Sequence, residues 1–366
     1  MLVILVTLHE LGHAIVARRN GVVVEEFGIG FPPRAWGKKL KNGVLFTINW
    51  LPLGGFVKLQ GEHDAATKKG DYGAATFWQK TKILFAGVFI NWLTAAVLLT
   101  ILAITGLPKI VDNQFSVAGD TTIHTSPVQL VAIEENSPAN QAGLEVGDKI
   151  LQVNGQEIST TQQLTQETRA LRGKTVPITY QRDGQQSTVQ VALRNADTAV
   201  LGVGLGQQEY IKATWSAPIV GVVTTGQFTW VTLQGLGNLV VNFFGGLFGQ
   251  LSLNPDTRQA ASEQLNSAGA SVAGPVGILG VIFPAASSAG LEQVVFLAAI
   301  ISLTLAVMNV LPIPSLDGGR WFVTAVFRLL KKPLTKEKEE SIHGTGFMAL
   351  MLLVVLITIA DVIKFF

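Results

Sequence analysis

The chain has 366 residues, enough for about two or three domains, but its composition excludes an ordinary soluble protein. Charged residues make up 14% and hydrophobic residues 48%, against about 25% charged residues in typical globular domains, and mean hydropathy is +0.40. A net charge of +2 gives no basis for nucleic-acid binding. The sequence contains no cysteine, which excludes disulfides and thiolate sites, so any metal must be held by histidine and carboxylate groups.

The first predicted element is an apolar helix over residues 1–19 that contains the sequence HELGH. Its two histidines, His9 and His13, are four residues apart and therefore share one face of the helix, roughly 5.4 Å apart along the axis. Histidines at this spacing can bind one Zn²⁺, and Glu10 between them can act as general base. The flanking Leu, Val and Ile residues predict a membrane helix, although a short one for a hydrocarbon core of ~30 Å. We therefore expect the natural chain to begin upstream.

The next segments change character twice before a domain of soluble type begins. Residues 20–82 are β-branched and aromatic with Gly, Pro-Pro and Asn-Gly, which predicts two or three short strands over 22–61 and then a polar loop. Residues 83–106 form a strongly apolar second membrane helix. Residues 109–206 alternate strand and turn signals like a soluble domain.

The remaining chain returns to a membrane pattern. Residues 207–290 are Gly-rich and mixed in polarity, which favours helices lying on the membrane surface, with a full span at 217–250 as the alternative. A third membrane helix, a basic loop and a fourth membrane helix follow. Lys and Arg are concentrated in 18–82 and 320–343, so the positive-inside rule predicts that both loops are cytoplasmic and that the soluble domain lies on the other side.

A third metal ligand is predicted far along the chain at Asp317. Pro312 and Pro314 break the third helix, and an ionisable residue at membrane depth indicates a functional site. The first and third helices run in the same direction, which puts Asp317 and the two histidines at similar depth. The alternative is a carboxylate that caps the following helix. Asn309 is interpreted either as a hydrogen bonder between helices or as a donor to a scissile carbonyl. The other histidines, His63, His124 and His343, are interpreted as solvated.

Several motifs together carry a family resemblance. In chain order they are HELGH, FGIGF, PLGGFVKLQGE, SPANQAGLEVGDKILQVNGQEI, GPVGI and NVLPIPSLDGGR. With these motifs the chain resembles the site-2 protease family of intramembrane zinc metalloproteases, in particular the bacterial regulated intramembrane proteases of the RseP type. The resemblance implies that His9, His13 and Asp317 bind Zn²⁺, that Glu10 is the base, and that Asn309 assists substrate or oxyanion binding.

The resemblance also assigns the soluble insert and the strands near the N-terminus. The insert resembles a single PDZ domain, with turns at Gly143, Gly147 and Asn154-Gly155. Such a domain binds peptides by strand addition, or acts as a steric filter, or has the fold without a peptide ligand. A strand edge would hold the unwound substrate by backbone pairing, since a helix hides its peptide bonds; the alternative is a hairpin that never touches substrate. The residues predicted for this substrate contact are Gly28, Gly30, Gly54, Gly55, Phe56 and Val57.

The sequence therefore predicts a polytopic α-helical membrane protein with four transmembrane helices, a membrane-associated β-hairpin or sheet, and an inserted β-rich PDZ domain. The expected function is intramembrane zinc endopeptidase in a bacterial inner or plasma membrane, cleaving single-span substrates such as anti-sigma factors or signal-peptide remnants. The alternatives are a tethered soluble-side protease and a non-catalytic PDZ scaffold or chaperone. The predicted parts are helix 1 with the histidine motif (1–19), β region and loop (20–82), helix 2 (83–106), PDZ domain (109–206), surface region (207–290), helix 3 with the Asp317 motif (291–319), cytoplasmic loop (320–344) and helix 4 (345–364).

Overall fold

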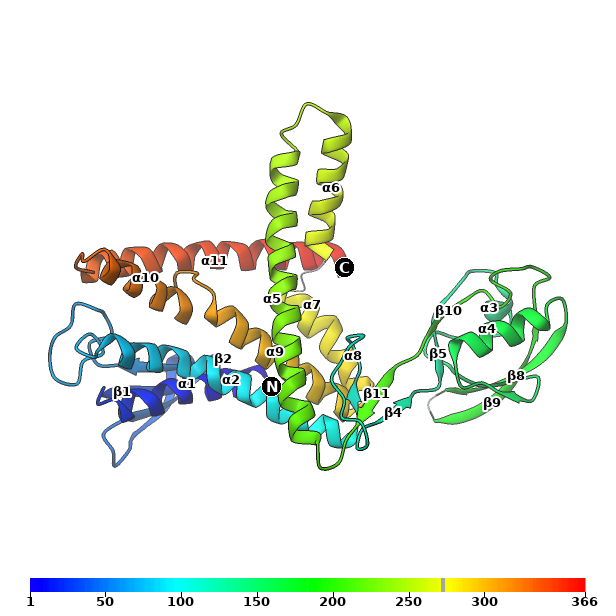
Figure 1. The fold of residues 1–366 in the computed structure, drawn as a ribbon, viewed down its shortest axis with the longest axis horizontal. Coiled ribbons are helices and arrows are strands. Elements are labelled where there is room, and N and C mark those ends of the chain that lie inside the picture. The colour runs from blue at the N-terminus through cyan, green and yellow to red at the C-terminus, as the bar shows by residue number, and fades with distance from the viewer. Residues whose placement is uncertain (183, 271–273, 366) are drawn as a thin grey trace. The chain divides into compact units, whose positions relative to one another are not determined.

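The computed structural model describes residues 1–182, 184–270 and 274–365 (Figure 1). The chain forms two compact units. The first unit combines Met1–Leu102 with Ala217–Phe366, and the second is the continuous segment Ala103–Ser216 between them. The second unit is thus an insertion into a membrane-type unit whose two halves lie far apart in sequence.

The first unit is built mainly from long helices. Within the described residues, four helices are long and apolar enough to cross a membrane, which makes the chain a membrane protein. Three of them correspond to the second, third and fourth predicted membrane helices, and the other is Ala217–Gly249. The first predicted helix, Leu2–Arg19, is less apolar, because its 18 residues include Glu10, Arg18 and Arg19. The helices of this unit that surround the predicted site are α1 (Leu2–Arg19), α2 (Phe77–Thr105), α9 (Leu291–Val310), α10 (Asp317–Leu329) and α11 (Lys336–Phe365).

The segment 207–290 differs from the expected set of surface helices. It contains α5 (Ala217–Gly249), which meets the length and apolarity of a spanning helix, and α6 (Pro255–Ala270), which folds back along α5 (Figure 1). Two of the glycines in this segment are packing sites against α6, because a Cβ at Gly246 would lie 2.6 Å from the side chain of Leu265 and one at Gly249 would lie 2.7 Å from that of Ala261. Short helical pieces follow: α7 (Pro275–Gly277), a π-helical turn η1 (Ile278–Ile282) and α8 (Phe283–Ser288).

The region after α9 also differs from the prediction. Helix α9 ends at Val310, just before the prolines that are predicted to break it, because proline lacks an N–H and restricts the backbone before it. The segment predicted as a loop over 320–344 is largely helical, since α10 begins at Asp317 and α11 begins at Lys336. Acidic residues in the first turn of α11, Glu337 and Glu339, suit a helix N-terminus.

The N-terminal sheet consists of two long irregular strands, β1 (Val24–Lys39) and β2 (Leu45–Leu59), where two or three short ones are predicted. The first part of β1 lies between two parts of β2. Phe27 of β1 therefore pairs with Phe46 on one side and with Val57 on the other. The segments therefore lie side by side in the order 34–39, 45–51, 24–31 and 55–59. Within the described residues, segment 55–59 pairs with β1 alone and is an edge of the sheet.

The second unit contains two antiparallel sheets and two short helices, and its larger sheet encloses an apolar core that includes Val128, Leu130, Ile150 and Ile178. A small sheet in the order β3-β11-β4 joins residues on both sides of the predicted 109–206 domain. Its strands are β3 (Leu107–Pro108), β4 (Thr122–Thr125) and β11 (Glu209–Lys212). The larger sheet has the strand order β10-β5-β6-β8-β9, and β7 pairs with β6. Its strands are β5 (Val128–Ile133), β6 (Lys149–Val153), β7 (Gln156–Glu157), β8 (Thr175–Arg182), β9 (Gln185–Ala192) and β10 (Val203–Gly206). The helices of this unit are α3 (Pro138–Gln141) and α4 (Thr161–Ala170).

Candidate metal centre

The structure brings together His9 and His13 of α1 with Asp317, which lies near the other end of the chain. The carboxylate of Asp317 places Oδ2 3.1 Å from His9 Nε2 and 3.3 Å from His13 Nε2. The two Nε2 atoms lie 3.0 Å from one another, and both imidazoles are buried. Three potential ligand atoms therefore converge on one point.

The chemistry of these groups fits a metal ion. Asp317 Oδ2 is buried and has no hydrogen-bond partner among the described residues, although it faces the two ring nitrogens. A set of two imidazole nitrogens and one carboxylate oxygen is typical of catalytic zinc, which needs three protein ligands and one open position. A cation shared by the three atoms would satisfy the otherwise unpaired oxygen.

His13 is already held in the form that binds metal. Its Nδ1 lies 2.7 Å from the backbone carbonyl oxygen of Ile83 in α2. A carbonyl only accepts hydrogen bonds, so Nδ1 must carry the proton and Nε2 is left with a free lone pair. The backbone of α2 therefore fixes the tautomer and the ring orientation of this histidine.

The close approach of α2 to the two histidines depends on a glycine that the sequence analysis did not single out. A Cβ added at Gly87 would lie 2.4 Å from His13 Nε2 and 2.6 Å from His9 Cε1. Any side chain there would occupy the space in which the ligand atoms meet. The only signal in the sequence is the spacing of Ile83, Gly87 and Asn91, which places them on one face of α2.

The position of Asp317 depends on the two glycines that follow it. Asp317 is the first residue of α10, and the chain between α9 and α10 turns sharply through the two prolines. A Cβ at Gly318 would lie 2.0 Å from the carbonyl oxygen of Val310, and one at Gly319 would lie 1.8 Å from that of Ile313. Only glycine allows the first turn of α10 to pack against this turn, so the Asp-Gly-Gly sequence is a packing requirement of the site.

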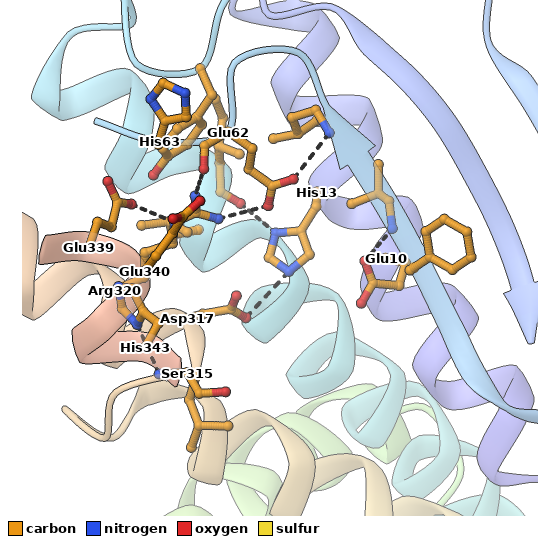
Figure 2. A pocket seen from close by; sticks show the side chains of 17 residues that line it. Glu10, His13, Glu62, His63, Ser315, Asp317, Arg320, Glu339, Glu340 and His343 are labelled. Carbon is orange, nitrogen blue, oxygen red and sulfur yellow. Dashed lines mark hydrogen bonds and ion pairs between the residues drawn. The ribbon is translucent and has the colours of Figure 1, made fainter. Parts of the chain in front are cut away.

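Glu10 lines the same cavity as His13 and Asp317 (Figure 2). Its Oε2 accepts a hydrogen bond of 3.0 Å from the backbone N–H of Val57, in the edge segment 55–59. The cavity has a volume of about 450 Å³ and is also lined by Phe56 and Leu59 of this edge. The carboxylate, two of the ligands and the strand edge thus face one space.

The residues predicted to contact substrate separate into three groups. Phe56 and Val57 line the cavity. Gly54 and Gly55 pack beside α1, near the side chains of Val6 and Thr7. Gly28 and Gly30 are required inside the sheet: a Cβ at Gly28 would lie 2.3 Å from the Phe56 ring, and one at Gly30 would lie 2.8 Å from the Leu51 carbonyl oxygen. The structure therefore gives these last two glycines a packing role, away from the cavity lining.

Asn309 is not among the residues that line the cavity. Its Nδ2 donates to the carbonyl oxygen of Leu305, one turn earlier in α9, at 3.0 Å. His124 lies in the second unit, on β4. His63 and His343, which are interpreted as solvated from the sequence, line the cavity instead, and Nδ1 of His343 accepts a hydrogen bond of 3.0 Å from the N–H of Ser315.

A partly buried ionic network that the sequence analysis missed closes the polar end of the cavity (Figure 2). Arg320 donates at 2.8 Å to Glu62, lies 3.5 Å from Glu339, and stacks over the ring of Tyr72 at 4.8 Å. Burial works against the guanidinium charge, but Tyr72 and the two carboxylates hold the pKa of Arg320 above its ordinary value. The network ties α10, the loop after β2 and the first turn of α11 together three residues beyond Asp317.

Comparisons with known proteins support one family. The model described as Peptidase family M50 matches residues 1–353. The chain is 31% identical over 362 residues to "Putative zinc metalloprotease CPE1693" of Clostridium perfringens, covering 98% of this chain and 95% of the relative. It is 25% identical over 446 residues to "Regulator of sigma-W protease RasP" of Bacillus subtilis, covering 99% of this chain and 96% of the relative.

Solved structures match part of the chain. The PDZ domain of the SdrC-like protein from Listeria monocytogenes is 21% identical, covers 25% of this chain and 93% of that domain, and gives a TM-score of 0.20.

Proposed function

The chain belongs to peptidase family M50, and on this premise we propose that it is an intramembrane endopeptidase that cleaves transmembrane segments of other membrane proteins. Zinc metalloprotease activity follows from the family and from the names of its relatives, which confirms the predicted family and reaction class. The observation that carries the finer proposal is the geometry of the cavity. His13, Asp317 and Glu10 line it beside the edge of a sheet, His9 completes the ligand set behind them, and the unit consists mainly of long apolar helices.

Each residue of the site has a proposed part in hydrolysis. His9, His13 and Asp317 would hold Zn²⁺, which when bound acts as a Lewis acid and lowers the pKa of water. Glu10 takes the proton of the attacking water and returns it to the leaving amine. The N–H of Val57 holds the Glu10 carboxylate at the cavity wall, which orients it without occupying its second oxygen.

The edge segment 55–59 is the proposed platform for substrate. A transmembrane helix hides each peptide bond within its own hydrogen bonds, so local unwinding must precede cleavage. An extended substrate segment gains new backbone hydrogen bonds by adding to this edge, with side chains beside Phe56. Asn309 Nδ2 uses one of its two N–H groups on the carbonyl of Leu305, and to assist the oxyanion as predicted its second N–H must reach the cavity; an Asn309→Ala variant with unchanged kcat would remove it from the mechanism.

The proposed substrates are single-span membrane proteins, including anti-sigma factors and signal-peptide remnants. The relative from Bacillus subtilis is named a regulator of sigma-W, which supports the first class. We place the protein as a multi-pass protein in the bacterial inner or plasma membrane, with the second unit extracytoplasmic and the metal centre toward the cytoplasm. The uneven distribution of Lys and Arg supports this orientation.

The second unit is proposed to be a PDZ domain that screens the extracytoplasmic part of the substrate. Strand β10 is an edge of its larger sheet, as strand addition requires. A cavity of about 140 Å³ between this strand and α4 is lined by Leu164, Val203 and Leu205, which would accept an apolar side chain.

The test is a purified Glu10→Gln variant with a single-span substrate in detergent or liposomes. We expect cleavage to fall by a factor of about 10²–10⁴, because an amide cannot accept the proton of the attacking water. Zinc should remain at one ion per chain, because Glu10 is not among the proposed ligands. Undiminished cleavage would exclude Glu10 as the base. A wild-type protein that cleaves nothing and binds no zinc would instead favour the non-catalytic scaffold.

A further inference from the structure

Asn91 occupies a buried position in α2 directly behind the metal centre. Its side-chain amide lies 3.2 Å from His9 Nδ1, the ring nitrogen that faces away from the other ligand atoms. Asn91 is 1% exposed, and its Oδ1 has no hydrogen-bond partner among the described residues. A buried amide in an apolar helix costs free energy unless it is paired, so this residue requires an explanation.

The protonation of His9 supplies that explanation. With Nδ2 of Asn91 toward the ring, Nδ1 of His9 must accept, and the ring proton would then sit on Nε2, where it blocks metal binding. A half-turn of the amide exchanges its oxygen and nitrogen. Oδ1 then accepts from the protonated Nδ1, and Nε2 is left free to bind the metal. His13 is already held in this form by a backbone carbonyl.

We propose that Asn91 is a positioning residue for zinc, which accepts the Nδ1 proton of His9 through Oδ1 and keeps Nε2 available as a ligand. The two histidines are then matched: each donates its distal N–H to α2, His13 to the carbonyl of Ile83 and His9 to the side chain of Asn91. Such second contacts fix the tautomer and orientation of ligating histidines and raise their basicity.

A contact from a third helix supports this role. Ser302 of α9 is fully buried, and its Oγ donates at 2.9 Å to the backbone carbonyl of Asn91. Asn91 therefore lies where α1, α2 and α9 meet, and α9 leads directly into the turn that carries Asp317. Gly87, one turn away on the same face of α2, provides the space for the two imidazoles.

The measurement is the zinc dissociation constant of the purified full chain, obtained by competition with a chelator. Asn91→Leu keeps the approximate volume but removes the acceptor, and we expect zinc to bind 10–100-fold more weakly, the usual effect of losing such a contact. Asn91→Asp keeps an acceptor oxygen toward Nδ1, and we expect its affinity to be within about threefold of wild type. The metal-free Leu variant should keep the helix content of the wild type in circular dichroism, which separates the loss of the acceptor from a loss of the fold.

Thr94→Val is the matched control, because among the described residues the hydroxyl of Thr94 on the same helix donates to its own helix, at the carbonyl of Ile90. It should leave zinc affinity unchanged. Equal affinity of Asn91→Leu and wild type, or an equal loss in the Leu and Asp variants, would overturn the proposal. This inference rests on the proposed zinc site, and different results refute the two. A wild-type chain that binds no zinc would refute the site itself. A wild-type chain that binds zinc, with an affinity that does not change in the Asn91 variants, would refute this inference alone.

Discussion

At the scale of single residues, the site depends on three glycines, because the absence of their side chains leaves space for neighbouring groups. Gly87 keeps open the space beside both imidazoles, and Gly318 and Gly319 let the first turn of α10 reach the turn before it. None of the three glycines carries a reactive group, but a side chain at any of these positions would overlap neighbouring atoms. The cost of a methyl group at these positions depends on whether the neighbouring atoms can move, and around Gly87 the neighbours are the proposed ligands themselves.

Gly87→Ala should therefore abolish zinc binding without unfolding α2. Alanine is the better helix former by about 1 kcal/mol, so helix content should not fall, but its Cβ overlaps His13 Nε2. Zinc per chain measured by atomic absorption should drop from one toward zero. Gly226→Ala in α5 is the control, because a Cβ there meets nothing within 4 Å. Full zinc content in Gly87→Ala would show that the imidazoles can move aside.

A second prediction at this scale concerns the buried carboxylate of Asp148 in the second unit. Burial raises its pKa, but the paired hydrogen bonds from Arg182, at 2.7 and 2.8 Å, outweigh burial and lower the pKa below its usual value. A carboxyl whose pKa is lower when folded stabilises the fold above its unfolded pKa of about 3.9. That stability is lost as pH falls through the folded value.

We expect amide exchange in β6 and β8, corrected for intrinsic rates, to accelerate as the pH of the full chain is lowered from 5 toward 2. Asp148→Asn should be less protected at pH 7 and should lose part of this pH dependence, because the amide does not titrate. Identical pH profiles for the variant and the wild type would contradict the assignment.

At the scale of elements, the cavity is held by contacts between segments that are distant in sequence. Arg320 joins α10 to Glu62 in the loop after β2 and to Glu339 in α11. Asp361, near the end of α11, accepts hydrogen bonds from the backbone N–H groups of Gly274 and Gly277, at 3.1 and 2.7 Å. Helix α11 is thus attached near both ends, which keeps its first turns over the cavity.

Arg320→Gln should destabilise the protein by about 1–3 kcal/mol, because the buried carboxylate of Glu339 loses its cation, whereas the exposed carboxylate of Glu62 is screened by solvent. The double variant Arg320→Gln with Glu339→Gln should cost less than the sum of the two single variants, since both remove the same interaction. Unfolding in mixed micelles measures these differences. Additive effects would show that the 3.5 Å contact between the two groups contributes nothing.

At the scale of the whole molecule, the number of membrane crossings limits what α5 can do. If the basic segments 18–82 and 320–343 share one side, the chain between them crosses an even number of times. Helices α2 and α9 provide two crossings, so a crossing by α5 requires a fourth. Neither the 16-residue α6 nor the shorter apolar stretch Pro275–Ser288 reaches the about 20 residues needed. Despite its length, α5 is therefore expected to leave and re-enter on the same side.

The absence of cysteine makes this expectation simple to test with single-cysteine variants and a membrane-impermeant maleimide. In intact cells lacking an outer barrier, Gln166→Cys in the second unit and Glu263→Cys in α6 should both be labelled. Lys68→Cys and Lys338→Cys should be labelled only after permeabilisation. All four positions are exposed side chains, so accessibility within the protein is matched. Labelling of Glu263→Cys together with Lys68→Cys would show that α5 crosses.

The sequence by itself determined the reacting groups and the class of the protein. His9, Glu10 and His13 follow from helical spacing, and Asp317 from a charged residue at a broken apolar helix, because these signals are local. The family comparison confirms the reaction class that they predict. Local patterns predicted the wrong element bounds where a glycine-rich apolar sequence is compatible with two structures. Helix α5 is continuous where shorter helices are predicted, and β2 is one strand where two are predicted.

The tertiary structure alone decided what surrounds the histidines. The carbonyl of Ile83, the space at Gly87, the amide of Asn91 and the edge at Val57 all come from other elements, at distances that no spacing along the chain encodes. A periodic pattern reports which face of a helix is apolar, but not which atom of a neighbour lies against it. The sequence of HELGH thus supplied the ligands, whereas the packing of α2 and β2 decided the tautomer of His13 and the position of Glu10.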